Sequence, residues 1–396
     1  MATSTHTDET LPAGHRYLDA AATAPLRPEA FEAMLNVLRS GQANASSVHS
    51  AGHRARAVIE HARAEVAQAC GVRPTEVIFT SGGTEANNLA VIGLALAHSR
   101  GRHVVTSSIE HPSVLESCNY LGRVHGYEVT QVDVDQMAMV DVRRVEAALR
   151  DDTALVTIGL ANGEVGSVQP VPELMAVAAS NGVWCHTDAV QAAASLPASL
   201  ATGAWPGANV HAMSIASHKF GGPQGAGALL VRDGIPLEPV LHGGGQERGL
   251  RSGTENVAAI AGFAAAVTAA VRDIGTRALA LAASRDEFVS QVLATVPGAA
   301  LTGHPTERLP GHASFVIRGV SGESMLVALD AAGIAASSGS ACAAGKDEPS
   351  PVLLAMGVTA EVAQTSIRFT LHEPLTPAMR ERVVTVLARE AARAAR

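Results

Sequence analysis

The stretch EVIFTSGGTEANNLAVIGLALA, residues 76–97, decides the fold. It runs as apolar, strand-like residues to Thr80, turns at Gly82 and Gly83, and from Thr84 onward repeats apolar residues at helical spacing. The pattern predicts a strand, a glycine turn and a helix. Free amides at the first helical turn, the positive end of the helix dipole and the Thr84 hydroxyl favour a phosphate there. Taken alone, the segment also fits an ordinary glycine-rich connection.

Outward from this stretch, strand-like and helical segments alternate as far as residue 235. Strands that alternate with helices predict a mainly parallel sheet that helices cover on both faces. Ligands of such sheets bind outside the carboxyl ends of the strands. Polar residues at or just beyond predicted strand ends are therefore expected to converge: Thr80, His111, Asn162, Asp188 and Lys219. After Gly253 we expect a long helical stretch to about Val296, followed by short strands and helices.

Composition narrows the class of protein. With 396 residues, 47% hydrophobic and 17% charged, the chain can bury a large core in one large and one smaller domain. A net charge of −8 argues against direct nucleic-acid binding, which needs a basic surface.

Location is predicted from apolar segments and cysteines. The first sixteen residues are polar and resemble no signal peptide, and the apolar stretch 257–271 is too short and alanine-rich to span a bilayer. The four cysteines are widely spaced and form neither a CxxC pair nor a metal-ligand cluster. We expect a cytoplasmic protein with no membrane contact and no metal.

Lys219 and Asp188 indicate a carbonyl cofactor. A desolvated lysine at a strand end can form a Schiff base, and Asp188, 31 residues earlier, can hold the proton of a pyridine ring. Each residue alone has a plainer explanation, as a solvated lysine or a turn aspartate. Together with the phosphate-favouring turn, they are typical of a pyridoxal phosphate site.

Cys342 lies in AASSGSACAAGKDEPSPVLLAMG, residues 335–357, among small, turn-prone residues. Such surroundings predict an accessible thiol, whereas Cys70, Cys118 and Cys185 lie in segments that suit burial. The alternative is an inert cysteine in a flexible surface loop.

The chain resembles the NifS/IscS group of cysteine desulfurases, which are class V, fold-type I pyridoxal phosphate enzymes. The matching motifs run nearly end to end and keep the family order: YLDAAATAP (17–25), TSGGTEANN (80–88), EHPSVL (110–115), NGEVG (162–166), HTDAVQ (186–191), SHKFGGPQG (217–225), HGGGQERGLRSGTEN (242–256), SSGSAC (337–342) and SIRFTL (366–371). SSGSAC is typical of the first group of the family. The resemblance implies an α/β fold-type I transferase.

The same resemblance implies a division into three parts. Residues 1–26 would form an N-terminal tail and a segment that joins the small domain. Residues 27–274 would be the large pyridoxal phosphate-binding domain, with a mainly parallel sheet covered by helices. Residues 275–396 would be a smaller α+β domain that carries the catalytic cysteine loop.

For the cofactor, the resemblance implies Lys219 as the Schiff-base lysine and proton shuttle, Asp188 on the pyridine nitrogen and His111 stacked on the ring. Gln191 would bind the phenolic oxygen. Ala216 stands where many members have a phosphate-binding serine, so that contact is either lost or supplied by the neighbouring serine. The expected phosphate ligands are Gly83, Thr84, Ser217, His218 and, from the other subunit of a homodimer with shared sites, Thr254.

For the substrate, Arg368 resembles the arginine that binds an amino acid carboxylate with its guanidinium fork. A surface ion pair is the plainer alternative. Asn162 and Asn44 would assist, although QANASS at 42–47 replaces the usual GNPSS around Asn44.

The implied reaction converts L-cysteine to L-alanine and leaves a persulfide on Cys342 for a sulfur-acceptor protein. Iron–sulfur cluster assembly, tRNA thiolation and DNA phosphorothioation are all open as destinations. Alternatives are a related pyridoxal phosphate lyase, such as a selenocysteine lyase or cysteine sulfinate desulfinase, and a non-catalytic sulfur-relay partner. The related lyase would keep Lys219 and Asp188 but would not need Cys342.

Overall fold

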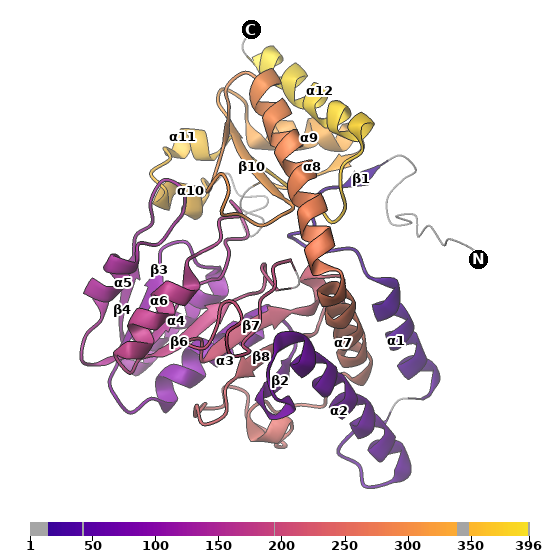
Figure 1. Cartoon of the computed structure of the whole chain (residues 1–396), viewed down its shortest axis with the longest axis vertical. Helices are drawn as coiled ribbons and strands as arrows, with labels where there is room; N and C mark the ends of the chain where they lie inside the picture. The colour runs from indigo at the N-terminus through magenta and orange to yellow at the C-terminus, as the bar shows by residue number, and fades with distance from the viewer. Residues whose placement is uncertain (1–14, 42, 194, 339–347, 395–396) are drawn as a thin grey trace.

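The computed structural model describes residues 15–41, 43–193, 195–338 and 348–394. These residues form a larger lobe around a wide sheet and a smaller lobe, which lies above the larger one in Figure 1. Short 3₁₀ turns lie at Pro74–Glu76, Ser217–Lys219 and Glu247–Gly249. The fold is α/β, as predicted.

Within the described residues, the wide sheet contains seven strands. Their order across the sheet is β2 (Val77–Thr80), β8 (Gly227–Val231), β7 (Ala212–Ala216), β6 (Trp184–Asp188), β5 (Thr153–Thr157), β3 (His103–Ser107) and β4 (Glu128–Val132). The run from β7 to β4 is parallel, while β8 is antiparallel to both of its neighbours. The prediction of a mainly parallel sheet is confirmed.

Helices cover both faces of this sheet. Successive strand residues point to opposite faces, and apolar residues on each face pack against helices. Val104 and Leu229 pack in the layer that contains α3 and α4, whereas Val105 and Leu230 pack in the opposite layer. The helices of the larger lobe are α1 (Pro28–Arg39), α2 (Ser50–Cys70), α3 (Gly83–Ala97), α4 (Pro112–His125), α5 (Val142–Ala148), α6 (Val171–Ser180) and α7 (Val257–Arg272).

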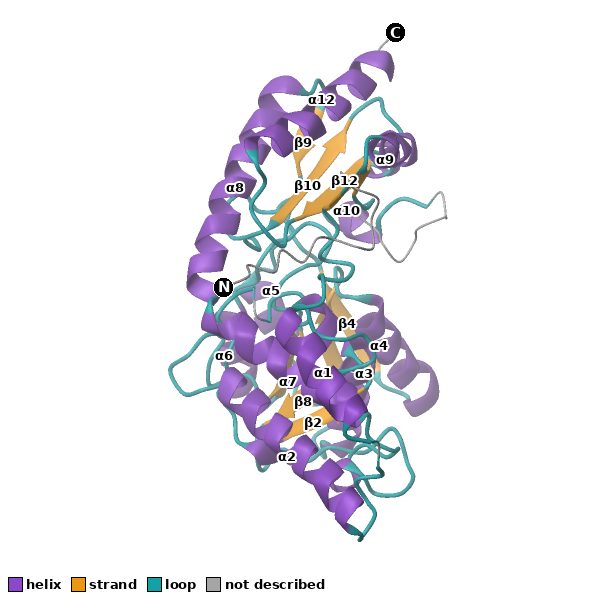
Figure 2. Cartoon of the chain, turned by 90° about the vertical axis from the view of Figure 1, so that its right-hand side faces the viewer, coloured by secondary structure: helices purple, strands orange, loops and turns teal. Residues whose placement is uncertain are grey.

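The smaller lobe packs helices against a short antiparallel sheet of order β12 (Ser366–Thr370), β10 (His312–Ile317), β9 (Ala299–Leu301). Figure 2 shows α8 (Ile274–Thr295), α9 and α12 around these strands, and side chains from all three helices pack into one core with alternate residues of β10 and β12. Phe288, Phe315 and Phe369 meet edge to face in its core. The remaining elements are α9 (Gly322–Ala331), α10 (Pro351–Ala355), α11 (Ala360–Ala363), α12 (Pro377–Ala394), and β1 (Arg16–Tyr17), which pairs with β11 (Ile334–Ala335).

The stretch predicted as helical to about Val296 is two helices. α7 ends at Arg272, α8 (Ile274–Thr295) begins after Asp273, and the two axes differ by 71°. This bend lies next to the predicted domain boundary at 274/275. Among the described residues, no single helix is long and apolar enough to cross a membrane, and only this bent pair reaches the required length and hydropathy when joined.

Candidate active site

A cavity of about 660 Å³ lies at the carboxyl ends of the parallel strands, where the smaller lobe meets the sheet. Residues from both lobes line it. The structure brings together in its wall nine of the residues predicted from sequence: Gly83, Thr84, His111, Asn162, Asp188, Gln191, His218, Lys219 and Arg368. The predicted convergence at the strand ends therefore produces one cavity.

The glycine turn between β2 and α3 forms one wall of this cavity. Gly82 has φ +155°, a conformation that side chains disfavour. A Cβ on Gly83 would lie 2.6 Å from Cγ2 of Val190, so only glycine leaves the start of α3 open. Thr80 does not line the cavity, and its hydroxyl instead donates to the carbonyl of Gly82 at 3.0 Å.

Lys219 lies in the 3₁₀ turn directly after β7, with its ammonium inside the site. Its Nζ donates to the carbonyls of Ala21 at 2.7 Å and Ala22 at 3.0 Å, and Gln191 donates to the carbonyl of Ala21 at 3.1 Å. Burial and the charge of Lys219 lower the pKa of the neighbouring His218 to about 4. The N-terminal segment that follows β1 therefore forms part of the site, which the motifs alone did not reveal.

Asp188 ends β6, and both of its carboxylate oxygens accept hydrogen bonds. Oδ1 accepts from the amide of Val190 at 2.8 Å, and Oδ2 accepts from Nδ2 of Asn87 at 2.6 Å. The carboxylate is thus held in one orientation on the cavity wall. Asn87 was quoted in the TSGGTEANN motif without a role, and only the fold places it beside Asp188.

Arg368 is not a surface ion pair, because its side chain is only 5% exposed. Nη2 donates to Asp19 at 2.7 Å and Nη1 to the carbonyl of Gly163 at 2.9 Å. Nε is buried and has no hydrogen-bond acceptor among the described residues. The guanidinium is therefore fixed on one side and keeps an unused donor.

Asn162 lines the cavity, but its amide mainly holds the loop after β5. Nδ2 donates to the carbonyl of Ile109 at 3.0 Å, and Oδ1 accepts from the amides of Glu164 and Val165, each at 2.9 Å. This arrangement suits a residue that shapes the site.

Two buried carboxyl groups in the wall were not predicted. Burial raises the pKa of Glu110 to about 7, although Ser107 and the amide of Gly159 donate to its carboxyl group. Burial raises the pKa of Glu164 to about 6, against the opposing effects of a hydrogen bond from Ser350 and the charge of Arg368. Carboxyl groups with raised pKa values are common at functional sites.

Three further predicted site residues, all among the described residues, do not line the cavity wall. Ser217 is fully buried, and its hydroxyl lies against Gly222, where an added Cβ would approach it to 2.0 Å. Its side chain therefore faces Gly222 and is not part of the cavity wall, so its contact with a phosphate stays a prediction. Cys342 lies outside the described residues. Asn44 and Thr254 are exposed, and neither is part of the cavity wall.

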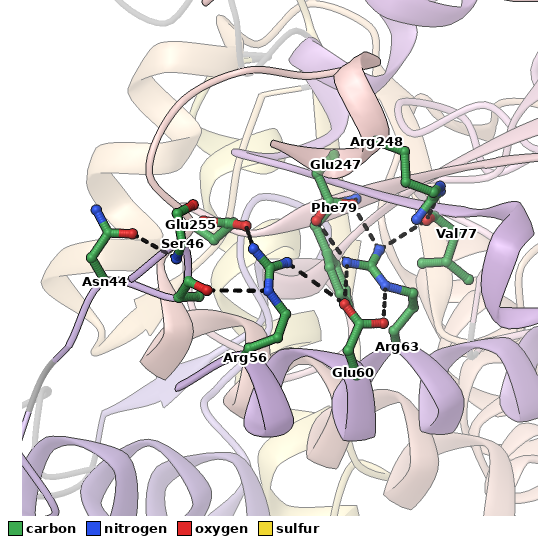
Figure 3. Close-up of polar contacts among 11 residues, drawn as sticks. Asn44, Ser46, Arg56, Glu60, Arg63, Val77, Phe79, Glu247, Arg248 and Glu255 are labelled. Atoms are coloured by element: carbon green, nitrogen blue, oxygen red, sulfur yellow. Dashed lines mark hydrogen bonds and ion pairs between the residues drawn. The ribbon is translucent and has the colours of Figure 1, made fainter. Parts of the chain in front are cut away.

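The segments that carry Asn44 and Thr254 are both fastened to α2, as Figure 3 shows. Arg56 donates to the carbonyl of Ala45 at 3.3 Å and pairs with the buried Glu255 at 3.1 Å. These contacts hold two exposed, polar segments in fixed positions on the surface.

Residues 16–374 match the model of the aminotransferase class-V family. The chain belongs to this family. It is 43% identical to the cysteine desulfurase IscS of Dictyoglomus turgidum, over 90% of this chain and 89% of that protein. Among solved structures it resembles a NifS-like protein, with 34% identity, a TM-score of 0.87 and coverage of 95% of this chain and 98% of that one. It also resembles SspA in complex with cysteine, with 32% identity, a TM-score of 0.78 and coverage of 91% and 100%.

Pyridoxal phosphate is the cofactor of this class-V family, and the residues present fit it. The open glycine cradle at Gly83 suits a phosphate, since a side chain there would meet Val190. Lys219 offers an amine inside the cavity. The fixed carboxylate of Asp188 suits a protonated ring nitrogen.

Proposed function

We propose that this cavity converts L-cysteine to L-alanine and passes the sulfur to Cys342 as a persulfide. The observation that carries the proposal is the meeting of Lys219, Asp188, His111 and Arg368 in one cavity. Two findings support L-cysteine as the substrate: the relatives' names, and the related SspA structure that contains cysteine.

Arg368 binds the carboxylate of the substrate. Asp19 and Gly163 use one hydrogen of each terminal nitrogen, which leaves the second hydrogen of each for a ligand. A guanidinium held in this way presents a planar pair of donors to a carboxylate. Because the ion pair with Asp19 fixes the guanidinium before the substrate arrives, little freedom is lost on binding.

Lys219 moves the proton of the substrate α-carbon. When bound, pyridoxal phosphate supplies a carbonyl for the substrate amine and a ring that accepts the electrons released at the α-carbon. Asp188 would hold the proton of the ring nitrogen, and His111 would stack on the ring. Thr84 and His218 complete the phosphate site.

Cys342 takes the sulfur. Its thiolate attacks the substrate sulfur, the carbon–sulfur bond breaks with its electron pair staying on carbon, and a proton added to that carbon gives alanine. Ser337 exchanges two backbone hydrogen bonds with Arg368, at 2.7 and 3.2 Å, and Pro351 lines the cavity.

A second copy of the chain completes the site in this proposal. Thr254 is exposed on one protomer and would reach the phosphate site of the other in a homodimer, while the exposed Asn44 stays a predicted substrate contact. A sulfur-acceptor protein then collects the persulfide. Iron–sulfur cluster assembly, tRNA thiolation and DNA phosphorothioation stay open as destinations, and the cytoplasmic location stays a prediction.

The test uses the purified protein loaded with pyridoxal phosphate, with alanine and sulfide measured after addition of L-cysteine. We expect a visible absorption band, alanine production, and loss of turnover in Cys342→Ala with the band retained. Alanine production that survives in Cys342→Ala would favour a lyase that does not need this thiol. A protein that binds no cofactor would refute the role of Lys219.

A further inference from the structure

A chain of hydrogen bonds joins His111 to Asp188 through two residues without an assigned role. Nδ1 of His111 lies 2.7 Å from the hydroxyl of Ser113, and that hydroxyl accepts from Nδ2 of Asn87 at 2.9 Å. The same Nδ2 donates to Oδ2 of Asp188 at 2.6 Å. Ser113 and Asn87 are buried, at 7% and 1% exposure. The chain thus links the start of α4 to the end of β6 through α3.

The direction of the Asn87 amide follows from its neighbours. Its Nδ2 has two hydrogens and two partners, the Ser113 hydroxyl and the Asp188 carboxylate. A flipped amide would turn its oxygen toward the carboxylate and place two acceptors 2.6 Å apart. The amide therefore donates in both directions, and it leaves the Ser113 hydroxyl hydrogen free to point at His111.

The same geometry fixes the proton on the imidazole ring. The backbone amide of Ser113 donates to Nδ1 of His111 at 3.1 Å, and this N–H cannot reverse its role. The Ser113 hydroxyl donates to the same Nδ1. With two donors directed at it, Nδ1 cannot carry a proton, so the neutral ring carries its proton on Nε2. The ring itself remains accessible from the cavity.

We propose that Asn87 and Ser113 are positioning residues that lock His111 in the Nε2–H tautomer and couple the ring to the Asp188 carboxylate. The consequence for the site rests on the proposed function, in which His111 and Asp188 contact the cofactor. With pyridoxal phosphate bound, this one network would orient both His111, which would stack on the cofactor ring, and Asp188, which would hold the proton of the ring nitrogen. A ring locked as an Nε2 donor offers a hydrogen bond toward the cavity and does not act as a base there.

The charged groups around the ring agree with a neutral imidazole. Burial lowers the pKa of His111, Asp188 raises it, and Lys219 lowers it again. Glu110 precedes the ring in the chain and has a pKa raised to about 7, so part of its population is uncharged at neutral pH. Asp188 from β6 and Lys219 from the turn after β7 thus have opposite effects on the pKa of His111.

The test is nuclear magnetic resonance of the full-length, pyridoxal phosphate-loaded protein with ¹⁵N-labelled histidine, before any cysteine is added. A His111→Asn variant assigns the signals. We expect a protonated Nε2 and an unprotonated Nδ1. Ser113→Ala removes a donor that stabilises the neutral ring, so the pKa of His111 should rise by roughly half to one unit. Asn87→Ala should shift it in the same direction, and the double variant should add nothing to Ser113→Ala.

Ser167→Ala is the matched control. Ser167 is a buried serine that donates to the backbone carbonyl of Met137 at 2.7 Å, and it does not line the cavity. It should leave the His111 signals unchanged. A wild-type ring protonated on Nδ1 would overturn the proposal, even if the variants fail to fold. So would a Ser113→Ala shift no larger than that of the control. Neither readout depends on turnover, so loss of the desulfurase proposal would leave this result interpretable.

Discussion

Replacing Arg368 by lysine tests whether the guanidinium fork, rather than its charge, selects an amino acid carboxylate. The substitution keeps a positive charge near Asp19, which pairs with Arg368 at 2.7 Å. It removes the planar donor pair and the contact with the carbonyl of Gly163 at 2.9 Å. An ammonium can serve one partner well but cannot hold Asp19, Gly163 and a substrate carboxylate together.

The expected size follows from the bonds that are lost. One hydrogen bond to a charged group is worth about 1.5–3 kcal/mol, so the KM for L-cysteine should rise about 10- to 150-fold. The free energy of unfolding should also fall, by about 1 kcal/mol, because the carbonyl of Gly163 loses one of its two hydrogen-bond donors and keeps only His312. A change in stability alone would not raise the KM.

Arg308→Lys separates the two effects. Arg308 is also buried, at 5% exposure, and donates to backbone carbonyls, including that of His304 at 2.7 Å, but it does not line the cavity. Both variants should unfold at lower urea concentration, and only Arg368→Lys should raise the KM in a steady-state assay of alanine production. An unchanged KM in Arg368→Lys, or an equal rise in Arg308→Lys, would refute the assigned carboxylate site.

Three further perturbations test other parts of the structure. The pKa of Glu110 is raised from 4.5 to about 7, so the folded state holds this proton more tightly than the unfolded state. The free energy of unfolding should therefore fall by about 3 kcal/mol as the pH rises from 4.5 through 7. Urea denaturation across that range should show this fall in the wild type and a flatter profile in Glu110→Gln, and parallel profiles would contradict the assignment. Arg63 donates to both oxygens of Glu247 at 2.7 Å, and the two side chains are 3% and 0% exposed (Figure 3). Arg63→Met should therefore lower the free energy of unfolding by about 3–5 kcal/mol. The control Arg73→Met, in a pair whose arginine is 63% exposed, should lower it by less than about 1 kcal/mol. In Gly83→Ala the new Cβ would lie 2.6 Å from Val190. Equilibrium titration should therefore show pyridoxal phosphate binding weakened by about tenfold or more, and adding Val190→Ala should restore part of the affinity. Normal binding by the single variant would show that the turn is less tightly packed than described.

Much of the large sheet could be predicted because its strands are short, buried apolar runs separated by helical periodicity. The same alternation placed His111, Asp188 and Lys219 at one sheet edge. The reversal of β8 was not predicted, although a signal was present. Only ten residues separate Ala216 from Gly227, which is too short for the crossover that a parallel pair requires.

Other features of the site depend on contacts that no local pattern contains. Asp19 meets Arg368 across 349 residues of sequence, and Asn87 meets Asp188 across 101. The side chain of Ser217 points toward Gly222 because residues on either side of a strand end alternate in direction, which a motif match does not register. The break at Asp273 lies in RDIGTR, residues 272–277, where polar residues and Gly275 interrupt the apolar pattern, so a signal for it was present in the sequence.

The central claim is that sulfur from L-cysteine passes to Cys342. The most direct measurement is the mass of the peptide that carries Cys342, taken after a single turnover with L-cysteine and trapping of free thiols, beside an equal count of alanine formed. This peptide should gain one sulfur atom for each alanine produced. Alanine formed while the Cys342 peptide keeps its mass would show that the sulfur does not pass to Cys342.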